Sequence, residues 1–255
     1  ANVLTNFGWS STLRDLDAGI DTVAAVTFAA DDETKALEHL LAVQESENGL
    51  IFIDAQGRVA FVERNAIIAS PYTVSQVTFR DALAGGAGYP FIATVPAHDL
   101  DTTHNEWSGT RTGGVTQTAS DTTAKDRDGI RSTQFSSLVT TDAVVESQAQ
   151  WKLAMFKDPL QRIESITVMP GLDTGFWQAV LGLEVGERVT VRELPPVFDV
   201  ATSEDFIIQS IRARFDAGLV SAATFTFGLW PADTNTWMIL DDANSGQFDA
   251  GKLAY

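Results

Sequence analysis

The chain contains no cysteine among its 255 residues. Disulfide bonds and thiolate metal ligands are therefore excluded, and the composition carries no sign of a redox compartment. Histidine is scarce as well, with three residues, and none stands in an HExxH zinc motif or beside a GxSxG nucleophile turn. No apolar run approaches the roughly 20 residues that cross a bilayer, so we expect no transmembrane segment. The first residues also lack the basic and apolar regions of a secretory signal.

Basic side chains are the other shortage. The chain has 17 lysines and arginines against 34 aspartates and glutamates, which gives a formal net charge of −17. An acidic surface repels nucleic-acid phosphates, and the basic residues are scattered, with Arg212 and Arg214 as the closest set in an expected strand. We therefore expect no specific nucleic-acid binding, and solubility is the simplest reading of the acidic excess.

What the chain does have is enough apolar sequence, 44% of its residues, to build one large domain or two smaller ones. The clearest element is an amphipathic helix that ends near Gly49, with Asp31 or Asp32 as its cap. Its apolar positions recur at three- and four-residue spacing. They are Ala36, Leu37, Leu40, Leu41 and Val43.

A β-hairpin is predicted directly after this helix. Residues 50–54 and 58–63 are rich in β-branched and aromatic side chains, and the short polar segment that ends in Gly57 allows the chain to reverse. The first part of the chain is therefore expected to be a small α+β unit.

A second helix is predicted between Thr140 and Pro159, with Thr140 or Thr141 as its cap. It carries two apolar stripes. The first comprises Val145, Ala149, Leu153 and Phe156, and the second comprises Val144, Trp151 and Met155. Two stripes predict two contact surfaces. Packing within one domain is the simpler interpretation, and the alternative is that the second stripe faces another subunit, because aromatic residues are enriched in interface cores.

Strands dominate the rest of the chain. Segments 162–169, 187–193, 205–216 and 222–230 alternate or run apolar, and a short helix is expected near residues 176–181. The predicted fold class is α+β, with a helix plus β-hairpin domain followed by a β-rich barrel- or sandwich-like domain with one packed helix. The predicted divisions are an α+β domain at 1–75, a loop-rich β connecting region at 76–139, and a helix plus antiparallel barrel-like domain at 140–255.

These elements also carry a family resemblance. The residues that carry it near the N-terminus are Gly8-Trp9, Leu16-Asp17-Ala18-Gly19, Leu37 to Leu41, Glu47 to Asp54 and Gly57-Arg58-Val59-Ala60-Phe61. Further along they are Asn105 to Gly114, Asp128-Gly129-Ile130-Arg131, Leu181 to Val191, Phe206 to Ile211, Trp237 to Asp242 and Leu253-Ala254-Tyr255. In their order and spacing these segments resemble minor tail proteins, similar to the tail-tip hub, of long-tailed phages that infect actinobacteria.

The resemblance implies a structural, non-enzymatic protein located in the virion at the tail tip, without a cofactor. It implies a homotrimeric ring around the tail channel that contacts distal tail and tape-measure proteins as well as receptor-binding or tip proteins. An acidic channel lining would let DNA pass without sticking. Related chains usually carry more sequence before the Gly8-Trp9 segment, so we expect this chain to be the C-terminal part of a longer protein or a fragment of it.

Two other classes of function stay open. A glycan-binding β-sandwich could use Trp107, Trp230 and Trp237, which stand in polar or loop contexts, as an aromatic platform, although packing is the simpler interpretation. A cell-wall hydrolase would need a pair of carboxylates in a cleft, and their separation in space is not visible in a sequence.

A metal site is the weakest of the chemical hypotheses. His98, Asp99, Asp101, His104 and Glu106 supply enough nitrogen and oxygen donors for a divalent ion, but their spacing fits no known metal motif. A polar loop that leads into a strand explains the same residues, so no metal ligand is predicted.

Overall fold

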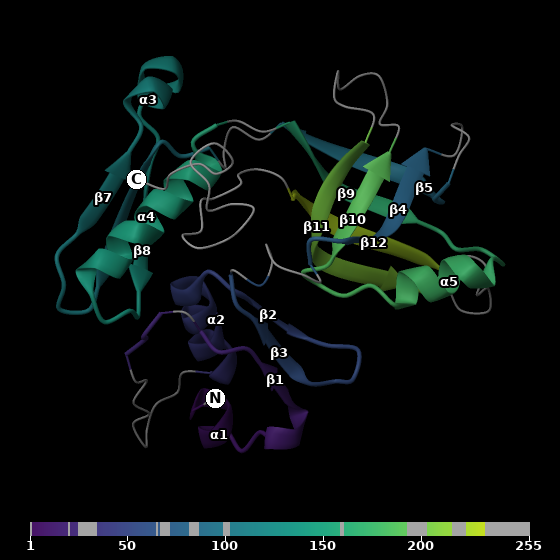
Figure 1. Cartoon of the computed structure of the whole chain (residues 1–255), viewed down its shortest axis with the longest axis horizontal. Coiled ribbons are helices and arrows are strands. Elements are labelled where there is room, and N and C mark those ends of the chain that lie inside the picture. The colour runs from purple at the N-terminus through teal and green to yellow at the C-terminus, as the bar shows by residue number, and fades with distance from the viewer. Residues whose placement is uncertain are drawn as a thin grey trace. The chain divides into compact units, whose positions relative to one another are not determined.

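The computed structural model describes residues 2–19, 21–24, 35–64, 66, 72–81, 87–98, 103–158, 161–192, 203–215 and 223–232. These residues form two compact units, shown in Figure 1, and each unit combines segments that are distant in the sequence. The first, here called the two-sheet unit, draws on Ala1–Arg64 and Asp99–Pro159. The second, the barrel unit, draws on Asn65–His98 and Leu160–Asp233. The two units therefore alternate along the chain, whereas the predicted domains follow one another at 1–75, 76–139 and 140–255.

The first sheet of the two-sheet unit contains the predicted hairpin. Its strands are β1 (Arg14–Leu16), β2 (Leu50–Ile53) and β3 (Val59–Val62), in the order β1-β3-β2. β2 and β3 are antiparallel, as predicted, and Gly57 turns the chain between them with a φ of 76°. β1 adds to the other side of β3 in parallel.

Three short or medium helices accompany this sheet: α1 (Asn2–Asn6), the 3₁₀ helix η1 (Ser11–Leu13) and α2 (Ala36–Glu47). α2 is the first predicted helix. It ends at Asn48, which adopts the left-handed conformation with a φ of 53° one residue before the expected Gly49. At its start Lys35 provides no side-chain cap, and the expected caps Asp31 and Asp32 lie outside the described residues.

The second sheet has β6 (Glu106–Arg111) at its centre, antiparallel to β7 (Gln117–Ser120) and parallel to β8 (Ser132–Ser137). The helices of this part are α3 (Thr122–Asp128) and α4 (Asp142–Phe156). α4 confirms the second predicted helix, with Thr141 at the N-cap position. Its buried stripe covers the sheet in a small core of Ala119, Phe135, Val139, Val145 and Ala149.

The barrel unit is a closed six-stranded barrel in the order β10-β11-β12-β9-β5-β4. Its strands are β4 (Ser75–Asp81), β5 (Tyr89–His98), β9 (Gln161–Val168), β10 (Arg188–Arg192), β11 (Ser203–Arg214) and β12 (Thr224–Pro231). Helix α5 (Thr174–Leu181) packs on the barrel, begins with the cap Asp173, and adds Phe176 and Val180 to the core.

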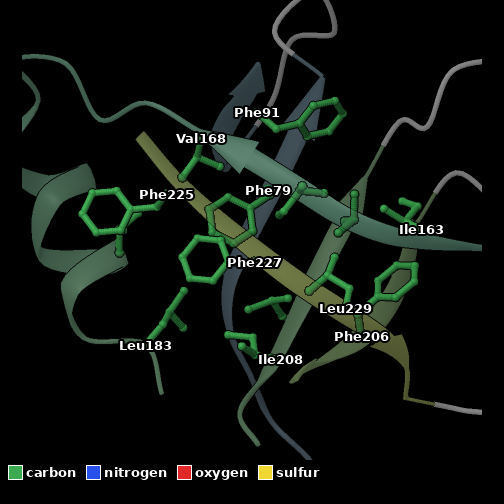
Figure 2. Packing of buried hydrophobic residues seen from close by; sticks show 14 of the residues in the cluster. Phe79, Phe91, Ile163, Val168, Leu183, Phe206, Ile208, Phe225, Phe227 and Leu229 are labelled. Atoms are coloured by element: carbon green, nitrogen blue, oxygen red, sulfur yellow. The ribbon is translucent and has the colours of Figure 1, made fainter. Parts of the chain in front are cut away.

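Side chains that alternate along the strands fill the barrel. On β12, Phe225, Phe227 and Leu229 point inward and are buried, whereas Thr224 and Thr226 on the other face are only half-buried. Figure 2 shows these inward side chains with Phe79 and other residues from neighbouring strands in one cluster. The α+β fold with a β-rich domain is thus confirmed, and β4 and β5, which the sequence analysis places across the α+β domain and the loop-rich connecting region, belong to the barrel.

Candidate interaction surfaces

The two stripes of α4 behave differently. Val145 and Ala149 of the first stripe are fully buried in the core of the two-sheet unit. Val144, which the sequence analysis places in the second stripe, also packs against that core. Trp151 and Met155 are half-buried. Of the three residues predicted at an interface, Trp151 and Met155 are therefore the two that are not part of the described core cluster.

Trp107 is half-buried and packs against residues of its own unit. Its ring centroid lies 5.5 Å from that of Phe156, 6.3 Å from that of Phe135 and 5.4 Å from that of His104. Its indole Nε1 is buried, and the described residues offer it no hydrogen-bond acceptor. This packing favours a structural role for Trp107 over an exposed sugar platform.

Lys152 of α4 adds a cation to the same aromatic group. Its ammonium nitrogen lies 5.4 Å from the ring centroid of Trp107 and 5.2 Å from that of Phe135. Burial lowers the pKa of Lys152 below its ordinary value, and the nearby carboxylate of Glu45 opposes part of that decrease. The two rings thus hold a partly desolvated charge that a carboxylate on α2 stabilises.

The other members of the predicted aromatic platform belong to another unit or lie outside the described residues. Trp230 is half-buried on β12 in the barrel unit, where it pairs with Ile207 of β11. Trp237 lies outside the described residues. Trp107 and Trp230 therefore belong to different units.

The predicted apolar face of α2 is only partly covered. Leu37 is 60% exposed and Leu41 is 49% exposed, whereas the buried residues of the helix are the polar Ser46 and Glu47. Leu37 and Leu41 therefore contribute little to holding the helix in place, and polar contacts at its C-terminal turn anchor it instead.

Ser46 is the centre of that anchoring. Its hydroxyl accepts a hydrogen bond of 2.9 Å from the Leu138 backbone N–H and donates one of 2.7 Å to the Ala42 carbonyl. The side-chain amide of Gln148 donates to the Ser46 carbonyl. The local sequence around Ser46 does not indicate its contacts with Leu138 and Gln148, because these two partners lie far along the chain.

The barrel unit has an open hollow of about 510 Å³ beside β4 and α5. Gln76, Gln178, Glu187 and Arg192 give it a polar lining around the ring of Tyr89. Burial raises the pKa of Glu187 above its ordinary value, although the carboxylate accepts a hydrogen bond of 2.8 Å from the Glu184 backbone. The hollow can receive a polar group.

The residues considered for a metal site are engaged elsewhere or not described. Glu106 forms an ion pair of 2.5 Å with Lys125, and His104 stacks edge-on against Trp107. Asp99 and Asp101 lie outside the described residues. In the described part of the chain no group of three or more potential ligands gathers closely enough to hold a metal ion.

No described helix is long and apolar enough to cross a membrane. The described chain is thus an α+β protein built from a two-sheet unit and a closed six-stranded barrel unit. No protein-family model and no curated protein sequence matches the chain.

Solved structures share its fold. The 43 kDa tail protein of prophage MuSo2 from Shewanella oneidensis superimposes with a TM-score of 0.54 at 13% identity, covering 91% of this chain and 61% of that protein. A tail protein from Neisseria meningitidis MC58 superimposes with a TM-score of 0.59 at 13% identity, covering 89% of this chain and 63% of that protein. The chain therefore has the fold of these tail proteins and spans about three fifths of their length.

Proposed function

We propose that the chain is a structural component of a phage tail, and within the tail a hub-like protein of the tip. The observation that carries this proposal is the likeness of fold to two solved tail proteins over 89% and 91% of the chain. The order of the sequence segments, which resembles that of minor tail proteins, supports the same function independently of the fold.

In this role the chain works by assembly and not by catalysis. We propose that copies form a homotrimeric ring around the tail channel, and that the ring joins distal tail and tape-measure proteins to receptor-binding or tip proteins. A ring uses heterologous contacts, in which two different surfaces of neighbouring copies meet. The net charge of −17 suits a channel that DNA must traverse without binding.

Immunogold electron microscopy of phage particles from the source of this chain tests the proposal. An antibody raised against the chain should label the tail tip. Label along the tail tube would support a tail protein and refute the hub location, whereas label at the capsid would refute the tail function. Absence of label from both intact and opened particles would overturn the tail function, and glycan binding and digestion of purified cell wall would then be the assays for the competing classes.

A further inference from the structure

One strand of the barrel extends beyond its neighbour. β11 is 12 residues long, but β10 pairs only with Ser203–Ile207. On the edge of β11 that faces β10, the last backbone hydrogen bond runs from the Gly186 N–H to the Ile208 carbonyl at 2.8 Å. From Ser210 onward β11 pairs with β12, and among the described residues no strand pairs with its other side. We call residues 209–214 the β11 overhang.

The overhang has an apolar face and a basic face. Ile211 and Ala213 lie opposite Phe227 and Phe225 of β12, so their side chains share the side of the barrel core. Arg212 and Arg214 lie on the other side. Every residue of the overhang is exposed, including Ile211 at 37%.

An exposed strand edge of this kind is a template for pairing with another strand. Two overhangs would pair poorly with each other, because antiparallel pairing of identical segments would bring the like charges of Arg212 and Arg214 together. The edge therefore fits a strand that carries acidic residues two positions apart.

β1 together with the residue that follows it is such a segment. It pairs only with β3 among the described strands, so its other edge is open there. Asp15 and the following Asp17 are two positions apart and both exposed, with the Asp15 side chain 57% accessible. An ion pair of 2.6 Å with Arg58 holds the Asp15 carboxylate in place, and an N–H···O bond of 3.3 Å from Glu63 does the same for Asp17.

We propose that the β11 overhang of one copy pairs with β1 of a second copy, so that Arg212 and Arg214 face Asp15 and Asp17. The charges support this choice of partner. At a net charge of −17 two copies repel each other, and the arginine pair provides local attraction. The two edges belong to different units, which makes the contact heterologous and able to continue into a ring. Closure of that ring rests on the proposed tail function, whereas the contact itself does not.

A charge exchange between two variants tests the contact. The first variant carries Arg212→Asp with Arg214→Asp, and the second carries Asp15→Arg with Asp17→Arg. Analytical ultracentrifugation at low ionic strength should show that the parent chain associates, that each variant alone is monomeric, and that an equimolar mixture associates again. Asp15→Arg and Asp17→Arg also remove the ion pair with Arg58 and the acceptor of the Glu63 N–H, so urea denaturation of each variant checks that it is still folded.

Cysteine cross-linking provides a second measurement, which does not need the charged residues to change. The chain has no native cysteine, and Leu16 and Ala213 would lie on the shared face opposite the charges. A mixture of Leu16→Cys and Ala213→Cys chains should give a covalent heterodimer when copper–phenanthroline oxidises the two thiols. Ser136→Cys, on the exposed face of β8, replaces either partner as the control.

The proposal is overturned if the parent stays monomeric, if the mixture of charge variants does not associate, or if the cross-link forms no faster than with the Ser136→Cys control. These outcomes are separate from the test of the tail function. Tip labelling without this contact would leave the tail function standing, and this contact without tip labelling would leave a self-associating protein of another function.

Discussion

The side-chain amide of Gln148 donates a hydrogen bond to the backbone carbonyl of Ser46, which lies 102 positions earlier in the chain. Gln148 is 1% exposed and Ser46 is 1% exposed. The contact ties α4, which covers the second sheet, to the C-terminal turn of α2. A buried polar contact between such distant segments stabilises the structure only in one arrangement of the two helices.

Removal of the Ser46 hydroxyl should therefore destabilise the two-sheet unit. Ser46→Ala leaves the Leu138 N–H without its acceptor, at a cost of about 1 to 3 kcal/mol in the free energy of unfolding. Urea denaturation followed by circular dichroism measures this change. Ser136→Ala, at an exposed serine of β8, is the matched control and should change stability by less than about 0.5 kcal/mol. Equal stability of both variants would mean that water replaces the hydroxyl.

The barrel core makes a second prediction. Phe227 is fully buried, and its ring centroid lies 5.6 Å from that of Phe79. Phe227→Ala should cost about 3 to 5 kcal/mol, because the transfer of the ring and the remaining cavity both destabilise the fold. Leu172→Ala removes an apolar side chain that is 89% exposed and should be nearly neutral. Thermal unfolding of the two variants side by side checks the contrast.

These two sites show what the sequence could and could not predict. The alternation of Phe225, Phe227 and Leu229 with threonine and glycine predicts a half-buried strand, because side-chain direction in a strand has a period of two residues. The Ser46 contact has no such pattern. It depends on which segments meet in space, and no local spacing records that information.

The same limit explains the leucines of α2 and the strands β4 and β5. Leu37 and Leu41 have helical spacing and are exposed, so the periodicity predicts the helix correctly but does not tell which of its positions are buried. β4 and β5 join the barrel through parallel pairing with each other and through long-range pairing with β10 and β9. None of these pairings joins two strands through a tight turn. The local sequence therefore does not indicate that β4 and β5 belong to the barrel.

An acid-dependent loss of stability is expected at Asp121, the N-cap of α3. The hydrogen bond from the Lys157 ammonium is the main cause that lowers the pKa of Asp121 below its ordinary 3.8, and the capping bond from Ala124 contributes. A lowered carboxyl pKa stabilises the folded state at pH values above 3.8, and this contribution is lost as the pH falls through the folded-state pKa.

Asp121→Asn keeps a capping oxygen and loses the ion pair, which measures 2.9 Å between Lys157 Nζ and the carboxylate. The variant should be less stable than the parent by roughly 0.5 kcal/mol near neutral pH, and the difference should shrink below pH 3.8. Asp126→Asn, on the exposed side of the same helix, is the control. A difference that stays constant at all pH values would show that weaker capping by the amide oxygen, and not the lost ion pair, is responsible.

Substitution of Trp107 distinguishes a structural role of this residue from a role in glycan binding. Its contacts with Phe156, Phe135 and the Lys152 ammonium predict that Trp107→Ala lowers the free energy of unfolding by about 3 to 5 kcal/mol. A sugar platform predicts little loss of stability and a loss of glycan affinity instead. Chemical denaturation together with calorimetric titration of cell-wall oligosaccharides distinguishes them. Tight glycan binding by the parent that disappears in a stably folded variant would refute the structural role.

Trp151 provides the corresponding test of subunit assembly. It is half-buried on α4 and, with Met155, lies outside the described core cluster of the two-sheet unit. If this stripe contacts a neighbouring copy, Trp151→Asp should prevent ring formation, because a carboxylate would be desolvated at an apolar contact. Glu146→Lys changes the charge at an exposed position about 140° away around the same helix and should leave the ring intact.

Light scattering of the purified chains reports assembly, and urea denaturation shows whether each variant is still folded. A folded Trp151→Asp chain that forms the same ring as the parent would exclude this stripe from the interface. In that case the β11 overhang and β1 would be sufficient to hold neighbouring copies together, because a closed ring requires only one pair of complementary surfaces on each copy.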